Sequence, residues 1–470
     1  MKNNFSVFLF VLLIATSFFQ GCSKEDDYAG NPMGTLRFSA DTLSFDTVFS
    51  GIATTTAWLK IYNTGNRKIR ISGISLRSGG ESGYRINVDG VPGVAFTDVD
   101  IPAGDSLYLF VELTAPHQGD VKPVLVGDAV LFQAEGRQKQ IVLQAFSQDV
   151  TVWHGKIISS DTTLNAGKPF LIYDSLVVAD KVKLSLSEGV TFYFHDKARM
   201  VVCGTLKAVG TTISPVIFRG DRLDDVLPCL PYDFYPGQWE GLFFNASSYD
   251  NEFDHVVIRG AYTGIKADSS SLDKSKINIT NSLIHNMINT CIESNHCNMT
   301  IINSQLTNSG SNTVNLNGGK YDFIHCTIAN YQRLIACQGL ALALSNTSHT
   351  AFQAGFFNTI LYGNHTSEIR MDSYEQSVWN IQFRNCLLQS QKLTSDFASG
   401  CIYSLDPFFL KLGDPKDGYR FDFRIGALSE ACNRADPQYS KVVPYDLNGV
   451  SRLSDTAPDI GAYEYVSGQK

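Results

Sequence analysis

Three segments near position 300 repeat at a fixed step: Ile-Thr-Asn-Ser-Leu-Ile-His-Asn (279–286), Ile-Ile-Asn-Ser-Gln-Leu-Thr-Asn (301–308) and Phe-Ile-His-Cys-Thr-Ile-Ala-Asn (323–330). Their third residues, Asn281, Asn303 and His325, follow one another at 22 residues (303−281 and 325−303). Short β-type segments that recur at such a step predict a solenoid in which each repeat forms one coil.

The pattern extends over residues 151–465. Equivalent central positions carry Asn or His: His255, Asn281, Asn303, His325, Asn358 and Asn385. The steps between them reach 33 residues (358−325), so the longer ones predict loops that leave a coil without breaking the stack. Asn at a turn can hydrogen-bond the same residue one coil away, while inward positions need apolar side chains. We therefore predict an all-β chain whose larger part is a right-handed parallel β-helix, followed by a tail at 466–470.

Residues 34–150 show a different pattern. About eight short segments rich in branched and aromatic residues alternate with turns, as in an antiparallel β-sandwich. The segments Ile-Tyr-Asn-Thr-Gly-Asn (61–66) and Ile-Pro-Ala-Gly-Asp-Ser (101–106) also resemble immunoglobulin-like domains of the ASPM and Hydin type. This resemblance implies a spacer or docking module and no catalytic residue.

The chain opens with the features of an export signal. A positive start precedes an apolar run at 5–19, shorter than the roughly 20 residues that span a bilayer. Phe-Phe-Gln-Gly-Cys (18–22) resembles a bacterial lipobox, which implies that a signal peptide at 1–21 is removed and that Cys22 is lipidated. Residues 22–33 are expected to form a flexible tether. Acyl chains on Cys22 would then hold the protein on a membrane.

Further motifs resemble one group of exported proteins. Ser-Lys-Glu-Asp-Asp (23–27) is similar to the surface-export signal of Bacteroidota lipoproteins. The segments 187–195, 203–211, 236–244 and 457–465 together resemble the right-handed β-helix surface lipoproteins of that phylum. The resemblance implies attachment to the outer membrane, facing the exterior. Because those proteins are described mainly by their fold, it does not assign a function.

Composition excludes some partners. The 470 residues include 38 Lys and Arg against 46 Asp and Glu, which gives a net charge of −8. The sequence contains no basic stripe, so nucleic acid is not an expected partner. Nine cysteines remain besides Cys22, and most are expected to be buried thiols. Cys291, His296 and Cys297 lack a second Cys-x-x-Cys pair, so no zinc site is predicted.

A β-helix could carry an active site only where suitable side chains fall in the same file of adjacent coils. Polysaccharide lyases need a base and cationic groups, and glycosidases need paired carboxylates. At the repeat step, Arg259 is followed by His285, Thr307 and Ala329. We therefore expect no file to accumulate acids or bases, and no catalytic residue is predicted. No nucleophile elbow or phosphate loop is present in the sequence.

The excursion at 219–241 is the best candidate for ligand contact. It combines carboxylates, a guanidinium and aromatic rings: Asp221, Arg222, Asp224, Asp225, Tyr232, Tyr235 and Trp239. Rings can stack on pyranose faces while carboxylates accept hydrogen bonds from sugar hydroxyls. The three most N-terminal carboxylates could alternatively hold calcium through oxygen ligands. The structural alternative is a long loop with Trp239 packed in the core.

Near the C-terminus, Asp446, Arg452 and Asp459 predict a cap on the last coil that is held by an ion pair. The expected function is non-enzymatic binding or adhesion at the cell surface, to glycan or to a surface protein. The alternative is a polysaccharide-degrading enzyme, a lyase or glycoside hydrolase, acting on the β-helix flank. A purely architectural role is a third hypothesis that the sequence does not separate from adhesion.

Overall fold

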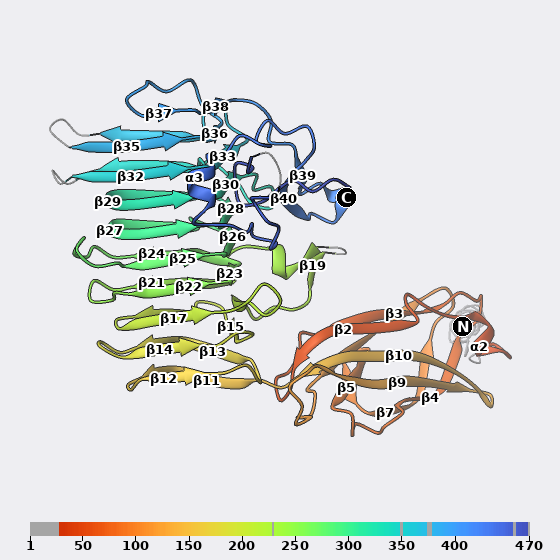
Figure 1. Ribbon diagram of the computed structural model, residues 1–470. Helices are drawn as coiled ribbons and strands as arrows, with labels where there is room; N and C mark the ends of the chain where they lie inside the picture. Colours follow the sequence, from red (N-terminus) through yellow and green to blue (C-terminus); the bar gives the residue numbers. More distant parts are fainter. Residues whose placement is uncertain (1–27, 228–229, 348–350, 374–377, 455–456, 469–470) are drawn as a thin grey trace, which may run out of the picture. The chain divides into compact units, whose positions relative to one another are not determined.

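The computed structural model describes residues 28–227, 230–347, 351–373, 378–454 and 457–468. The predicted signal peptide at 1–21 and Cys22 lie outside these residues. The described chain is all-β and divides into two compact units, the first ending at Gln148 and the second beginning at Asp149, with residues 120–122 grouped with the second (Figure 1). Within the described residues, no helix has the length and apolar character needed to cross a membrane.

The first unit contains two five-stranded sheets. One has the order β1 (Leu36–Phe38), β3 (Ala57–Asn63), β8 (Ser106–Leu113), β5 (Tyr84–Val88) and β6 (Val91–Gly93). The other has the order β2 (Thr42–Phe49), β10 (Arg137–Gln148), β9 (Val124–Ala134), β4 (Ile69–Leu76) and β7 (Ala95–Ile101). Neighbouring strands are antiparallel, except that β2 and β10 are parallel. Helix α2 (Pro32–Thr35) precedes β1.

Both sheets contribute to one hydrophobic core. Leu59 and Leu109 from the first sheet are buried in the same cluster as Ile71, Phe132 and Leu143 from the second. Along each of these strands, buried residues alternate with more exposed ones, as expected for a sheet with one face on the core and one in water. The first unit is therefore built from two sheets that cover one core.

The second unit consists mainly of a 26-stranded sheet in which the paired strands are parallel. Each strand pairs with its equivalents one coil before and one coil after, which is the arrangement of a parallel β-solenoid. The predicted all-β solenoid is confirmed at this level. Figure 1 shows the coils stacked from β11 (Thr151–Ile158) upward to β38 (Ile402–Tyr403).

The strands of the solenoid fall into three files within the described residues. The first file comprises β15 (Thr191–Phe194), β18 (Val216–Gly220), β23 (Val256–Arg259), β26 (Leu283–Met287), β28 (Gln305–Ser309), β30 (Thr327–Asn330), β33 (Ile360–Gly363), β36 (Leu387–Leu388) and β38. The second comprises β16 (Arg199–Val202), β21 (Trp239–Phe244), β24 (Ala261–Ala267), β31 (Leu342–Asn346) and β34 (Ile369–Ser373). The third comprises β12 (Thr162–Leu164), β14 (Lys183–Leu186), β17 (Thr205–Val209), β22 (Asn251–Asp254), β25 (Ile277–Thr280), β32 (Phe352–Phe357), β35 (Trp379–Arg384) and β37 (Ala398–Ser399).

Longer strands connect these files. Strands β11 and β13 (Phe170–Val178) bend through two files, as do β27 (Ile292–Ile302) and β29 (Val314–Ile324). Inside the coils, like residues stack in columns, for example Phe323 on Phe356 with ring centroids 4.9 Å apart and Phe356 on Phe383 at 4.9 Å. The prediction that most cysteines are buried is confirmed only in part. Among the described residues, Cys291, Cys297, Cys326 and Cys386 are buried in this core, whereas Cys203, Cys337, Cys401 and Cys432 are only partly buried.

The Asn and His file predicted from the repeat is confirmed. All six predicted positions have left-handed backbone, with φ between 48° and 51°. Asn303 Nδ2 donates to Asn281 Oδ1 at 2.7 Å, and Asn281 Nδ2 donates to Asp254 Oδ1 at 2.7 Å. Asn and His are among the non-glycine residues that adopt this conformation most readily. The backbone requirement of the turn, in addition to the side-chain ladder, therefore explains the residue choice.

The C-terminal segment corrects one prediction. It contains β39 (Phe409–Leu412), η2 (Pro415–Asp417), β40 (Phe421–Ile425) and α3 (Pro437–Ser440). It packs along the flank of the coils from β26 to β38 instead of closing the end of the last one. Arg452 pairs with Glu464, Nη1 to Oε1 at 2.5 Å, and not with Asp459. Arg452 Nη2 also donates to Asn303 Oδ1 at 2.6 Å.

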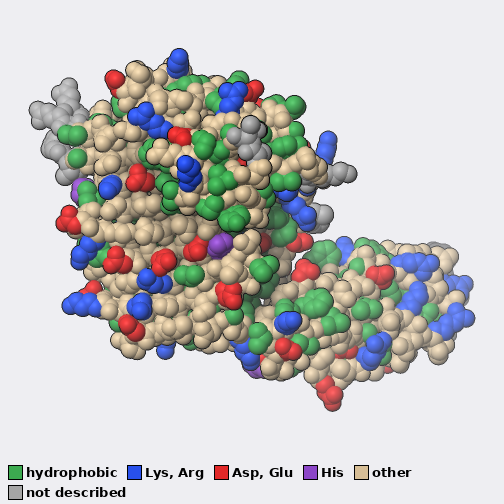
Figure 2. Space-filling model, viewed as in Figure 1, with side chains coloured by type: hydrophobic (Ala, Val, Ile, Leu, Met, Phe, Trp, Pro, Cys, Tyr) green, Lys and Arg blue, Asp and Glu red, His purple; other side chains and the backbone are tan. Residues whose placement is uncertain are grey.

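The C-terminal segment packs on this flank because of the outward residues of the first file. From β30 onward these include Ala329, Ile360 and Leu387, which would expose apolar surface to water without a cover. Phe423 and Tyr463 of the C-terminal segment pack on them. On the visible face of the second unit, acidic and basic side chains are interspersed (Figure 2).

Candidate functional site

The outward face of the first file carries a run of basic side chains. Tyr193 pairs with Arg219 in the next coil, the pairing of Phe218 with Ile258 brings Arg219 beside Arg259, and Arg259 pairs with His285. Three adjacent coils thus present Arg, Arg and His on one side. The prediction that no file accumulates acids or bases is wrong here. Arg219 and Arg259 are 40 residues apart (259−219) because an excursion leaves the coil between them, so the repeat step did not connect them.

The excursion contacts this basic run through one carboxylate, that of Asp233. It contains β19 (Asp225–Leu227), β20 (Leu230–Pro231) and η1 (Tyr232–Phe234). Asp233 Oδ1 lies 3.1 Å from Arg219 Nη2 and 2.8 Å from Arg259 Nε. Burial lowers the pKa of Arg259, and the adjacent Asp233 opposes that shift. Asp233 therefore neutralises part of the basic run and fixes the excursion on the coils.

His285 is the uncharged member of the run. Burial lowers its pKa to about 4, and the positive charge of Arg259 acts in the same direction. At neutral pH the imidazole is therefore neutral, with one nitrogen able to donate and the other to accept a hydrogen bond. Its side chain lines a hollow of about 200 Å³, whose wall is made by Phe234, Leu283, His285, Asn286, Gln305, Thr307, Asn308, Phe421, Asp422, Phe423 and Tyr463.

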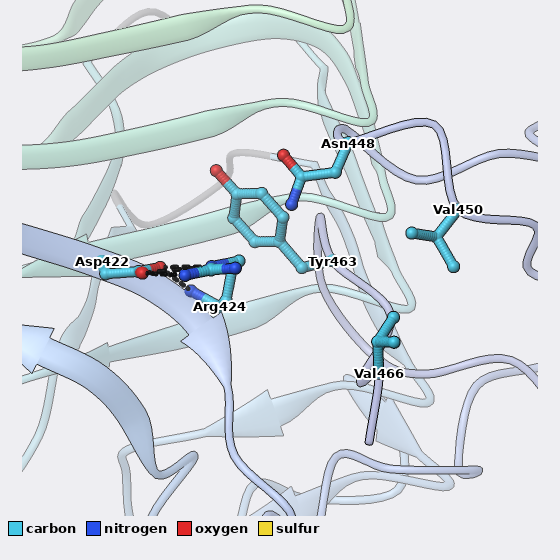
Figure 3. A pocket seen from close by; sticks show the side chains of 6 residues that line it. All are labelled: Asp422, Arg424, Asn448, Val450, Tyr463 and Val466. Atoms are coloured by element: carbon cyan, nitrogen blue, oxygen red, sulfur yellow. Dashed lines mark hydrogen bonds and ion pairs between the residues drawn. The ribbon is translucent and has the colours of Figure 1, made fainter. Parts of the chain in front are cut away.

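A second hollow of about 510 Å³ adjoins the first. It is lined by Asp422, Arg424, Asn448, Val450, Tyr463 and Val466 (Figure 3). Arg424 Nε donates to Asp422 Oδ1 at 2.9 Å, and Figure 3 shows the Tyr463 ring between this pair and Asn448. Because Asp422 and Tyr463 line both hollows, we treat the two as one feature, termed the flank groove.

The flank groove is built from three distant parts of the chain. The coils supply His285 and Gln305, the excursion supplies Phe234, and the C-terminal segment supplies Asp422 and Tyr463. Tyr463 Oη donates to Gln305 Oε1 at 2.6 Å, which fixes the segment against the coil. Sequence reasoning did not identify these residues. A signal existed for His285, since it follows Arg259 at the repeat step.

The predicted contact residues are brought together only in part. Arg222 Nε donates to Asp224 Oδ1 at 2.7 Å, and the guanidinium lies 4.0 Å from the centre of the Tyr232 ring. Asp221 instead contacts His195, Oδ2 to Nδ1 at 2.6 Å. Asp225 is exposed on β19.

Tyr235 and Trp239 have different environments. The Tyr235 ring lies 6.4 Å from that of Tyr232 in an edge-to-face arrangement on the excursion. Trp239 has no exposed surface: its ring stacks on Phe194 with centroids 4.3 Å apart, and its Nε1 donates to the carbonyl of Arg259 at 2.9 Å. Trp239 is therefore excluded as a ligand contact, and the alternative that it packs in the core is confirmed, because β21 directs the indole into the solenoid core.

The carboxylates considered for calcium do not converge. Asp221 is engaged by His195 and Asp224 by Arg222, so each already has a protein partner. Within the described ranges, no group of three or more His, Cys, Asp or Glu side chains is arranged to hold a metal ion. The oxygen ligands that calcium requires are thus not gathered by this excursion.

These features define an all-β protein with a two-sheet unit and a parallel solenoid that carries a groove on one flank. No protein-family model matches the chain, and no curated protein matches it. Solved structures with local similarity include a family 123 glycoside hydrolase from Clostridium perfringens (8% identity, TM-score 0.17) and the VesB protease of Vibrio cholerae (11%, 0.18). A Porphyromonas gingivalis protein of unknown function is 13% identical, with a TM-score of 0.18.

These matches are short. They cover 24%, 25% and 27% of this chain and 25%, 33% and 61% of the respective matched chains. The chain therefore spans less than two thirds of each of these proteins. Their TM-scores are too low to support a shared fold, so the function has to be argued from the flank groove itself.

Proposed function

We propose that this protein is a surface lipoprotein that binds polysaccharide in the flank groove without cleaving it. The observation that carries this proposal is the composition of the groove wall. Rings from Phe234, Phe423 and Tyr463 share the first hollow with amide and carboxylate groups from Gln305 and Asp422. Sugar rings offer apolar faces and a dense set of hydroxyls, and a wall that combines aromatic surface with placed polar groups meets both demands.

The proposal includes the attachment predicted from the sequence. Lipidation of Cys22 and the export signal at 23–27 would place the protein on the outer membrane, facing outward. The two-sheet unit would serve as an immunoglobulin-like spacer at 34–150, and the solenoid at 151–465 would be right-handed, the usual handedness of parallel crossover connections. The resemblance of the sequence motifs to Bacteroidota surface lipoproteins supports these parts.

A glycan panel tests the binding function directly. The chain that follows the leader is applied to immobilised neutral and acidic polysaccharides, with reducing ends and unsaturated uronates measured in parallel. Retention without product supports the proposal. Phe234→Ala should weaken retention, whereas Leu227→Ala, an exposed change on the same excursion but outside the groove, should not. Equal retention of both variants, or no retention of the wild type, contradicts the proposal.

A second candidate function rests on the basic run of the first file. A polysaccharide lyase removes the proton next to a uronate carboxylate, and it needs a neutral base and a cation that stabilises the resulting charge. His285 is neutral at pH 7, and Arg259 and Arg219 lie one and two coils away, respectively. Asp233 forms ion pairs with both guanidinium groups, so their positive charge is partly neutralised. This favours binding over catalysis. Release of unsaturated uronate that His285→Ala abolishes would establish the lyase instead.

A further inference from the structure

The outer face of one sheet in the first unit carries exposed aromatic rings. Trp58 and Tyr62 on β3 and Tyr108 on β8 are 56%, 37% and 38% exposed, and Phe110 on β8 is half-buried. Trp58 pairs directly with Phe110 across the two strands. These four residues alternate with Leu59, Ile61, Leu107 and Leu109, which fill the core. The rings therefore do not contribute to the core. They lie on the solvent-facing side of the sheet, where polar residues are usual.

The rings form a continuous strip across two strands. Trp58 and Tyr108 have centroids 5.5 Å apart, and Tyr108 and Phe110 have centroids 5.8 Å apart with ring planes within 17° of each other. Both strands are paired over their lengths, so the backbone that carries the rings is fixed by the sheet. Rigid rings side by side make a surface that binds flat apolar groups at low cost in conformational entropy.

Basic side chains frame this strip. Arg37 pairs with Tyr62, Lys60 pairs with Tyr108, and the Lys60 ammonium lies 4.7 Å from the centre of the Tyr108 ring. Arg85 on β5 lies beside Glu112, Nη2 to Oε2 at 3.4 Å. On the outward positions of β1, β3, β5 and β8 there are thus three basic residues against one acidic residue, although the chain as a whole is acidic.

We propose that this aromatic strip is a second glycan site, which binds an acidic polysaccharide. Pyranose rings stack on Trp58, Tyr108 and Phe110, while Lys60 and Arg37 pair with the carboxylate or sulfate groups of the sugar. Charge complementarity decides the class of occupant. A second copy of this chain docked on the same strip would set one basic patch against another, which like charges disfavour.

The aromatic strip is independent of the flank groove, since it belongs to the other unit. Two sites on one anchored chain would raise the avidity for a polymer without any new contact at either site. The inference therefore stands whether or not the flank groove binds sugar, and variants at the two sites separate them.

Affinity electrophoresis of the chain after the leader tests the proposal, in gels containing polygalacturonate, alginate or neutral dextran. The wild type should be retarded by the acidic polymers more than by dextran. Trp58→Ala combined with Tyr108→Ala should lose about tenfold or more in affinity, because the two rings on which the sugar stacks are removed. Phe146→Ala, 48% exposed on β10 of the other sheet, should bind as the wild type does. The groove variant Phe234→Ala should still be retarded more by the acidic polymers than by dextran, because the aromatic strip is intact.

The role of charge is tested separately. Lys60→Gln combined with Arg37→Gln should remove the preference for acidic over neutral polymer. All of these positions except Phe234 face outward from paired strands, so circular dichroism and melting temperature should match the wild type. The proposal is overturned if the acidic polymers do not retard the wild type, or if Phe146→Ala loses as much affinity as the aromatic double variant. It is also overturned if the aromatic double variant changes only dimerisation or only the binding of single-stranded nucleic acid.

Discussion

Arg452 and Glu464 form an ion pair with almost no exposed surface, Nη1 to Oε1 at 2.5 Å, on the flank of the solenoid. The same guanidinium donates to Asn303, 149 residues earlier in the chain. Both members of the ion pair belong to the C-terminal segment, and the hydrogen bond from Arg452 to Asn303 joins this segment to the coils.

Breaking this pair should be costly. Arg452→Met removes the buried partner of both Glu464 and Asn303, and loss of one partner of a buried pair typically costs about 3–5 kcal/mol. The free energy of unfolding from denaturant titration gives the value. Arg434→Met is the matched control, because its partner Glu430 and Arg434 itself are both about half exposed, and an exposed pair is worth about 0.2–1 kcal/mol. Equal losses would contradict the structure.

Glu464 should make stability depend on pH. Burial raises its pKa from 4.5 to about 8, with the nearby Asp459 acting in the same direction and Arg452 opposing. The folded protein then binds more protons than the unfolded chain between these values, so its contribution to stability is present below about pH 4.5 and is lost as pH rises toward about 8. Glu464→Gln should show a flatter fall in unfolding free energy from pH 5 to 8. If the slope of unfolding free energy against pH is the same in Glu464→Gln, the buried environment of Glu464 is contradicted.

The left-handed turns predict an unusual substitution order. Asn281 has φ of 49°, where a side chain with Cβ is strained and glycine is not. Asn281→Ala should therefore destabilise the protein by about 1–2 kcal/mol more than Asn281→Gly, because the left-handed conformation costs that much for an alanine. Thermal or denaturant unfolding measures the difference. The reverse order, with glycine worse, would mean that this turn is not left-handed.

Trp239 is predicted to matter for stability and not for ligand contact. Its removal in Trp239→Ala opens a cavity beside Phe194, which typically costs about 3–5 kcal/mol. Tyr235→Ala, on the half-exposed part of the excursion, should cost little. Unfolding curves of the two variants provide the comparison, and a small effect of Trp239→Ala would restore the surface role that the sequence suggested.

The parts of the fold that the sequence predicted are those set by local rules. Asn281, Asn303 and His325 recur at a constant step because each occupies the same left-handed turn, and neighbouring coils place them in contact. The apolar files follow from the same periodicity. These features needed no knowledge of how distant segments pack.

The flank groove could not be predicted in this way. Phe234 belongs to an excursion of irregular length, so the repeat gives no register between it and the coils. Tyr463 meets Gln305 across 158 residues, through packing that only the finished coils define. One signal was present: the outward file changes from polar Gln305 to apolar Ile360 and Leu387, which indicates that something covers it.

Hydrogen–deuterium exchange with and without a polysaccharide fragment retained in the glycan panel tests the central claim most directly. Within the solenoid unit, we predict slower exchange at 232–235, 283–286, 305–308 and 421–424, four of the stretches that line the flank groove. The third file at 352–357, on another face of the coils, is the internal control. Protection spread over that file, or none at the four stretches despite binding, would contradict the assignment of the groove.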